Sequence, residues 1–325
     1  MPSGEKLPSE LVARLMDRGS SVSRAEMLRW GTPAADLRRY LRSGLLLRTR
    51  RGLYALPLRE FDDHWDRLRS QHLQAAAAYS APASVLAFRT GSMALELPVA
   101  SIPERPELIQ PPGSSRPSGA VTRHRRLRVD EIHHCAGLFV TSKSRLAVDL
   151  ALELRAPEAL VTIDAVLRAG ADVAQLLASL HARGPVRHSR RAQQTLGWAD
   201  PYSESPLESW GRGELLLHGV PRPECNLELR FGGREIRPDM LWLPLGIAAE
   251  ADGRGKYDDH DALWREKRRQ EWMENTLGLS VLRFTYTEVR ENPAELASRW
   301  FRLADRKIAD PWVWPAGLEV KVREG

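Results

Sequence analysis

The sequence predicts an α/β chain of several domains, and three observations support this. Its 325 residues exceed what one hydrophobic core usually organises, so two or three domains are expected. The first 60 residues show helical periodicity followed by two short strands. The last third follows the order αβββαβα, typical of a mixed sheet with flanking helices. We expect one unit at 1–60, a connecting α+β region at 61–198, and the mixed-sheet domain with a C-terminal tail at 199–325.

Composition excludes several classes of protein. Hydrophobic residues make up 42% of the chain, which is enough to form buried cores. No run of about 18 apolar residues occurs, and the N-terminus lacks a basic-then-apolar signal layout, so we expect no membrane association. Two cysteines, Cys135 and Cys225, make no disulfide framework and are typical of a reducing cytoplasm.

The first unit has clear helix signals. Ser9 opens an amphipathic helix that Gly19 should end, and Ser23 with Glu26 forms a capping-box pattern for a second helix. Thr32 can cap a third helix that runs from Pro33 to Ser43. Short strands are expected at 45–49 and 52–56. Three helices followed by a two-stranded hairpin predict a winged helix-turn-helix.

Positive charge is concentrated in this unit. Residues 1–60 hold 12 basic and 6 acidic residues, a surplus as large as the +6 of the whole chain. Such concentration favours DNA as a partner. The predicted DNA contacts are Arg38, Arg39 and Arg42 on the third helix and Arg50 and Arg51 on the wing. The alternative is a protein-interaction winged helix with a solvated basic face.

The middle region alternates helices and strands. Helices are expected at 62–80, 82–97, 142–154, 157–169 and 173–180, and strands at 121–129 and 138–140. A proline-rich loop or strand edge should cover 103–117, and a basic connector 184–191. His133, His134 and Cys135 suggest zinc, but adjacent side chains on a strand point to opposite faces, which argues against one shared ion.

In the third unit, Ser205 starts a helix that reaches Leu217. A hairpin is expected from residues 225–231 and 234–243 across Gly232-Gly233. A strand at 246–251, a helix at 261–277, a strand at 281–284 and a helix at 293–304 should follow.

Acidic residues interrupt the apolar strands of this unit. Asp239 stands between Ile236 and Met240, and a short apolar run leads into Glu250 and Asp252. Carboxylates at the end of a buried strand cost free energy unless they are paired or metal-bound. Two or three converging carboxylates suit a hard divalent cation such as Mg²⁺. The alternative is that these acids are solvated strand ends and loop caps, since Asp252-Gly253 is a common turn pair.

The third unit resembles the PD-(D/E)xK nuclease superfamily, in particular very-short-patch-repair-like endonuclease domains. The resemblance covers about a third of the chain, and its motifs are Ser205-Pro206-Leu207-Glu208, Pro238-Asp239, Glu250-Ala251-Asp252-Gly253, Lys267-Arg268-Arg269 and Gly278 to Phe284. It implies Mg²⁺ or Mn²⁺ held by Asp239 and Glu250, with Glu208 reaching in from the first helix. The reaction implied is hydrolysis of DNA phosphodiesters.

One position departs from the superfamily pattern. The lysine that should stand two residues after the second acid is replaced by Asp252, which shares a strand face with Glu250. The sequence therefore makes Asp252 a candidate further catalytic acid and Lys256 the candidate cation. Arg268 and Arg269 are candidate phosphate contacts; alternatively they pair with Glu266, Glu271 and Glu274 on one helix face.

The first unit resembles the N-terminal winged helix of AbiEi-type antitoxins. The matching segments are Ser23 to Leu28, Leu37 to Leu41, Gly44-Leu45-Leu46 and Arg50 to Tyr54. The resemblance implies operator binding and repression, with a toxin or a second copy of the chain as a possible partner. Two functions are thus expected: a DNA-binding endonuclease, or a non-catalytic antitoxin or repressor that keeps the nuclease fold as a scaffold.

Overall fold

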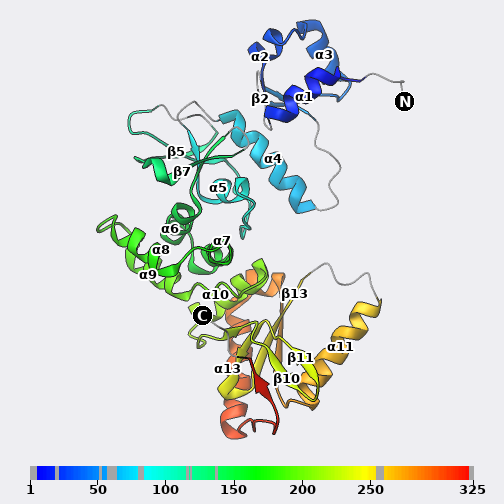
Figure 1. The fold of residues 1–325 in the computed structure, drawn as a ribbon, viewed down its shortest axis with the longest axis vertical. Coiled ribbons are helices and arrows are strands. Elements are labelled where there is room, and N and C mark those ends of the chain that lie inside the picture. The colour runs from blue at the N-terminus through cyan, green and yellow to red at the C-terminus, as the bar shows by residue number, and fades with distance from the viewer. Residues whose placement is uncertain are drawn as a thin grey trace. The chain divides into compact units, whose positions relative to one another are not determined.

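The computed structural model describes residues 6–18, 22–50, 53–56, 64–79, 84–114, 117, 119–135, 138–253 and 260–321 (Figure 1). The chain is mixed α/β and divides into two compact units, Met1–Leu146 and Ala147–Gly325. The division falls inside one helix, so the expected three-part organisation stays a prediction. In the described residues, none of the helices combines the length and apolar character needed to cross a membrane.

The chain begins with three helices and a small antiparallel sheet. The elements are α1 (Ser9–Arg18), β1 (Val22–Ser23), α2 (Arg24–Arg29), α3 (Ala34–Arg42), β2 (Leu47–Arg50) and β3 (Leu53–Ala55). Ser23 and Glu26 form the expected capping box, with the Glu26 N–H 3.2 Å from Ser23 Oγ. Pro33, rather than Thr32, precedes α3, and no side chain caps that helix. Strand β1 adds to the expected hairpin and gives the order β1-β3-β2.

A second sheet follows in the same unit. The helices are α4 (His64–Tyr79) and α5 (Phe88–Ala94), and the strands are β4 (Val85–Leu86), β5 (Glu107–Gln110), β6 (Val121–His124), β7 (Ile132–Cys135) and β8 (Leu138–Thr141), in the order β6-β5-β4-β8-β7. The helix expected at 82–97 is wrong in part, because Val85 and Leu86 pair with β5 and β8 as a central strand. The proline-rich stretch contains β5, which is buried throughout.

Helices dominate the start of the second unit. After α6 (Lys143–Glu153), which spans the division, come α7 (Ala156–Arg168), α8 (Val173–His181) and α9 (Ser189–Trp198). The basic connector expected at 184–191 ends earlier, because α9 already begins at Ser189. Fully buried Arg212 of the following helix donates to Asp164 of α7 at 2.6 Å. This pair ties the helices to the C-terminal sheet domain.

The main C-terminal sheet has the order β14-β13-β12-β9. Its strands are β9 (Glu224–Cys225), β12 (Met240–Trp242), β13 (Ile247–Asp252) and β14 (Ser280–Thr285), with only the β13–β14 pair parallel. Met273 of α11 (His260–Asn275) and Leu277, just after that helix, share a core with Leu241 and Ala248. The helices α10 (Pro206–Leu217), α12 (Tyr286–Glu291) and α13 (Pro293–Ala309) complete the domain.

The prediction of a hairpin across Gly232-Gly233 is confirmed for the residues next to the turn and is wrong for the outer ends of the two predicted strands. Strands β10 (Leu229–Phe231) and β11 (Arg234–Ile236) pair around the two glycines, whose φ angles of 58° and 76° suit a tight turn. Cys225 and Met240 belong instead to the main sheet. Asn226 interrupts the strand before the hairpin, because its φ is 49°. Pro238 interrupts the strand after it, because proline has no N–H to donate. The hairpin extends into a second sheet with β15 (Glu319–Val320).

Candidate active site

The strand register brings Asp239 and Glu250 together. Met240 of β12 pairs with Ala249 of β13, so the next step of the antiparallel ladder places Asp239 opposite Glu250. Residues opposite each other in such a ladder project from the same face. The Ala251 N–H donates to Asp239 Oδ2 at 2.7 Å, which fixes the Asp239 side chain against β13. Two carboxylates predicted from the sequence therefore share one end of the sheet.

Glu208 approaches the same region through Asn226. Ser205 caps α10 by accepting from the Glu208 N–H at 3.2 Å, which sets Glu208 in the first turn. The buried Glu208 carboxylate accepts from Asn226 Nδ2 and from the Glu204 N–H, each at 2.8 Å. The Asn226 N–H in turn donates to the Asp239 carbonyl at 3.1 Å. Glu208 thus positions Asn226, the neighbour of Asp239.

Glu250 has an arginine counterion from α11. Only 6% of Glu250 is exposed. Arg269 makes a two-point pair with it, at 2.9 Å from Nη1 and 3.1 Å from Nη2, and also donates to the Arg237 carbonyl at 2.6 Å. A nearly buried carboxylate requires such compensation. Of the two arginines predicted on this helix, Arg269 faces the acids and Arg268 is exposed.

Asp252 forms an ion pair with an arginine of the neighbouring strand. Arg283 of β14 donates from Nε to Asp252 Oδ2 at 2.9 Å and from Nη2 to Oδ1. Arg283 Nη1 also donates to Gln270 of α11 at 3.3 Å. The negative charge of Asp252 is therefore offset by an arginine of the neighbouring strand. Lys256 lies outside the described residues.

The carboxylates of Asp239 and Glu250 are the candidate ligands for a divalent metal ion. Among the described residues, no three His, Cys, Asp or Glu side chains converge on one point. Mg²⁺ is commonly held by one or two carboxylates together with water and substrate phosphate oxygens. Asp239, just before β12, and Glu250 of β13 are hard oxygen donors, so their chemistry fits such a site. A cation at Glu250 would take over the charge compensation that Arg269 provides.

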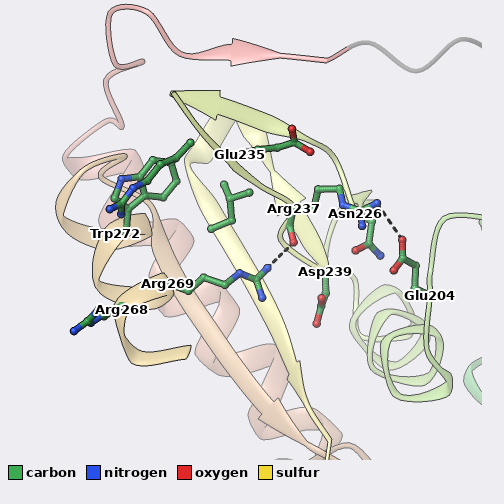
Figure 2. A pocket seen from close by; sticks show the side chains of 10 residues that line it. Glu204, Asn226, Glu235, Arg237, Asp239, Arg268, Arg269 and Trp272 are labelled. Carbon is green, nitrogen blue, oxygen red and sulfur yellow. Dashed lines mark hydrogen bonds and ion pairs between the residues drawn. The ribbon is translucent and has the colours of Figure 1, made fainter. Parts of the chain in front are cut away.

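A cavity of about 550 Å³ opens beside Asp239. Figure 2 shows Trp272 and Arg268 of α11 on one side of it and Asp239 and Glu204 on the other. Arg237 pairs with Glu204 at 3.3 Å. The complete lining is Glu204, Asn226, Arg234, Glu235, Ile236, Arg237, Asp239, Arg268, Arg269 and Trp272. The candidate metal ligand Asp239 is thus reached from an open, arginine-rich hollow.

The predicted DNA contacts of the first unit lie on α3 and β2. Arg38, Arg39 and Arg42 are exposed on α3, and Arg39 pairs with Asp36 at 3.0 Å. Arg50 ends β2, paired in register with Leu53. Arg51 lies outside the part of the chain that the structure describes.

Sequence reasoning missed Asn226 and Arg237. Asn226 is a non-glycine residue at positive φ, which asparagine tolerates better than most residues, but hydrophobic periodicity carries no such signal. Arg237 contributes its carbonyl to Arg269 and its side chain to Glu204. Its position directly before Pro238-Asp239 was visible in the sequence.

Comparison with known proteins finds sequence similarity to proteins of Mycobacterium tuberculosis. No protein-family model matches it. The chain is similar to an uncharacterized protein of Mycobacterium tuberculosis, MT2308 in strain CDC 1551 / Oshkosh and Rv2248 in strain ATCC 25618 / H37Rv. Identity is 29% over 204 residues, covering 61% of this chain and 73% of that protein. The crystal structure of the RV2827C protein from Mycobacterium tuberculosis is 18% identical and covers 66% of this chain and 82% of that chain, with a TM-score of 0.37.

Proposed function

We propose that this protein binds DNA and hydrolyses its phosphodiesters at a metal-dependent endonuclease-like site in the second unit. The observation that carries the proposal is the hydrogen bond from the Ala251 N–H to Asp239 Oδ2 at 2.7 Å, which holds the Asp239 carboxylate against β13 beside Glu250. Carboxylates concentrated at a sheet end beside an arginine-rich cavity suit a polyanionic substrate that brings its phosphate to a cation.

The residues have distinct proposed roles. Asp239 and Glu250 would hold Mg²⁺ or Mn²⁺, which when bound lowers the pKa of a water and stabilises charge on the phosphate. Glu208 acts indirectly on the metal site, because its carboxylate accepts a hydrogen bond from Asn226 Nδ2 at 2.8 Å and so positions the neighbour of Asp239. Arg283, which pairs with Asp252, is the candidate cation in place of the lysine that the resemblance expects.

The N-terminal part of the first unit, up to β3, is the proposed DNA-binding segment. Its element order α1-β1-α2-α3-β2-β3 supports the winged helix-turn-helix that the sequence predicts. In this proposal the exposed arginines of α3, Arg38 and Arg42 above all, contact the duplex. Each arginine that meets a phosphate should add about one unit to the dependence of log affinity on log salt.

A second candidate function is a non-catalytic repressor of the AbiEi antitoxin type. The observation in its favour is that two of the acids already have arginine partners, Glu250 with Arg269 and Asp252 with Arg283. A sheet end neutralised from within can serve as a scaffold without any metal. This candidate expects operator binding that is independent of divalent cations, and no cleavage.

Cleavage of supercoiled plasmid separates the two candidates. The purified chain is incubated with Mg²⁺ or Mn²⁺ beside Asp239→Asn and Glu250→Gln variants. Glu235→Gln is the matched control, because Glu235 lines the same cavity but pairs with Arg230 at 3.4 Å, away from the two acids. The endonuclease proposal expects nicking by the unchanged chain and the control alone. Equal cleavage by all four proteins, or by none, would refute it.

A further inference from the structure

The cavity beside Asp239 has one apolar wall. Trp272 of α11 is half-buried and packs on one side against the core that contains Ile236 and Leu241. Both Trp272 and buried Ile236 line the hollow. An indole on the wall of a cavity is a surface on which a planar ring can stack.

The rest of the cavity is rich in guanidinium groups. Arg234, Arg237, Arg268 and Arg269 all line it. Arg237 and Arg269 are engaged by Glu204 and Glu250. Within the described residues, Arg234 and Arg268 have no acidic partner within ion-pair distance, and both are exposed. Two available cations beside an aromatic wall fit a ligand that joins a flat ring to a phosphate.

Size and position narrow the ligand further. A cavity of about 550 Å³ is within the range of small-ligand sites and has room for a nucleotide, but not for a base-paired duplex. It also contains Asp239, one of the two proposed metal ligands. A nucleotide seated here would be next to the phosphodiester that reaches the acids.

We propose that this cavity binds one unpaired nucleotide of a DNA substrate, with its base against Trp272 and its phosphate at Arg234 and Arg268. Stacking on an aromatic ring does not depend on the identity of the base, so the site selects DNA with a single-stranded portion rather than a sequence. The inference rests on the proposed function for its choice of DNA as ligand. It concerns binding and does not depend on cleavage.

Binding to two DNAs that share one duplex tests the proposal. One is blunt, and the other carries a single-stranded thymidine extension of about four nucleotides at each end, a length within the site sizes of single-strand binding folds. Fluorescence anisotropy in EDTA gives the ratio of the two affinities for the full-length chain. Contacts of the first unit to the duplex are common to both DNAs and cancel in this ratio. We expect the extended DNA to bind about tenfold tighter, the effect of one base–aromatic stack.

Variants assign the preference to the cavity. Trp272→Ala should bring the ratio close to one, whereas Trp272→Phe, which keeps an aromatic face, should retain most of it. Trp314→Ala is the matched control, since Trp314 belongs to the same unit, is 44% exposed and lies outside the cavity. If Trp272→Ala does not fold, the Arg234→Gln/Arg268→Gln variant decides, because both side chains are exposed and their loss leaves the core intact.

Two outcomes overturn the proposal: equal affinity of the unchanged chain for both DNAs, or a folded Trp272→Ala or Arg234→Gln/Arg268→Gln variant that keeps the full preference. The proposed endonuclease fails separately. A chain that never cleaves but shows the Trp272-dependent preference would lose the enzymatic function and keep this site. A chain that cleaves without the preference would keep the function and lose the site.

Discussion

Arg283 and Asp252 form a two-point ion pair between the parallel strands β14 and β13, with Arg283 Nε 2.9 Å from Asp252 Oδ2. The strand register pairs Arg283 with Glu250, while the Arg283 guanidinium is bonded to Asp252. The sequence resemblance predicted a lysine at this position; the chain has an acid there, and that acid has an arginine partner.

Removing one partner of this pair should destabilise the second unit. The side chains of Asp252 and Arg283 are 16% and 28% exposed, so Arg283→Ala leaves a largely buried carboxylate unpaired. We expect a loss of about 2 kcal/mol in the free energy of unfolding, less than for a fully buried pair. Urea unfolding measures it. The Arg283→Ala/Asp252→Ala double variant should recover part of the loss; no recovery would mean that Arg283 acts through other contacts.

Close packing between α7 and α10 makes Gly213 sensitive to substitution. A Cβ at Gly213 would lie 2.6 Å from Pro157 Cα, and a backbone atom cannot move aside without shifting α7. Gly213→Ala should therefore cost about 2 kcal/mol of stability. Gly197→Ala in α9 is the control, because among the described residues no atom beyond its chain neighbours and its own helix backbone lies within 4 Å of the added methyl. Thermal unfolding that lowers the midpoint equally for both variants would contradict this packing.

His72 makes the stability of the first unit depend on pH. Burial, with a contribution from the Arg89 charge, lowers the pKa of His72 to about 4, and its ring lies 2.8 Å from Thr90 Oγ1. The unfolded chain binds the proton more readily, so this stability is present above about pH 6.5 and is lost as the pH falls toward 4. The loss should reach roughly 3 kcal/mol. Urea unfolding of the unchanged chain and of His72→Gln at pH 7 and pH 4.5 should show the steeper loss only in the former. Parallel losses would refute it.

Cys225 should be chemically inert although it is adjacent to the site residue Asn226. Burial raises the pKa of its thiol to about 12, and the side chain is fully enclosed. Thiolate is the reactive form, so native protein at pH 8 should not react with a thiol reagent at Cys225. Native Cys135→Ser protein should release no chromophore with Ellman's reagent and one equivalent after denaturation. One equivalent from native Cys135→Ser protein would show that Cys225 is accessible.

Local signals in the sequence predicted much of the fold. Ser23 with Glu26 and Ser205 before Pro206 mark helix starts that the structure confirms, because capping is decided by residues within one turn. The glycine pair 232–233 likewise marks its turn. Strand partners are different, because they depend on residues far apart in the chain. Val85 and Leu86 were predicted as helix, and only pairing with β5 and β8 makes them a strand.

The candidate site was partly predictable for the same reason. Asp239 and Glu250 were predicted as acids at strand ends, and the pairing of Met240 with Ala249 brings these two neighbouring positions together. The partners of the site acids were not predictable. Arg269 reaches Glu250 from a helix 19 residues away in sequence, and Asn226 reaches Glu208 from a position 18 residues away. A positive φ at Asn226 and the approach of α11 to the sheet are tertiary features that no local pattern encodes.

Binding of Mn²⁺ followed by electron paramagnetic resonance tests the central claim most directly, because it reads the metal site without requiring cleavage. The account predicts one bound ion per chain, displaced by excess Mg²⁺. Asp239→Asn and Glu250→Gln should each weaken binding by at least about tenfold, while Glu235→Gln leaves it unchanged. A chain that binds no Mn²⁺, or binds it equally well in all three variants, would contradict a metal centre at Asp239 and Glu250.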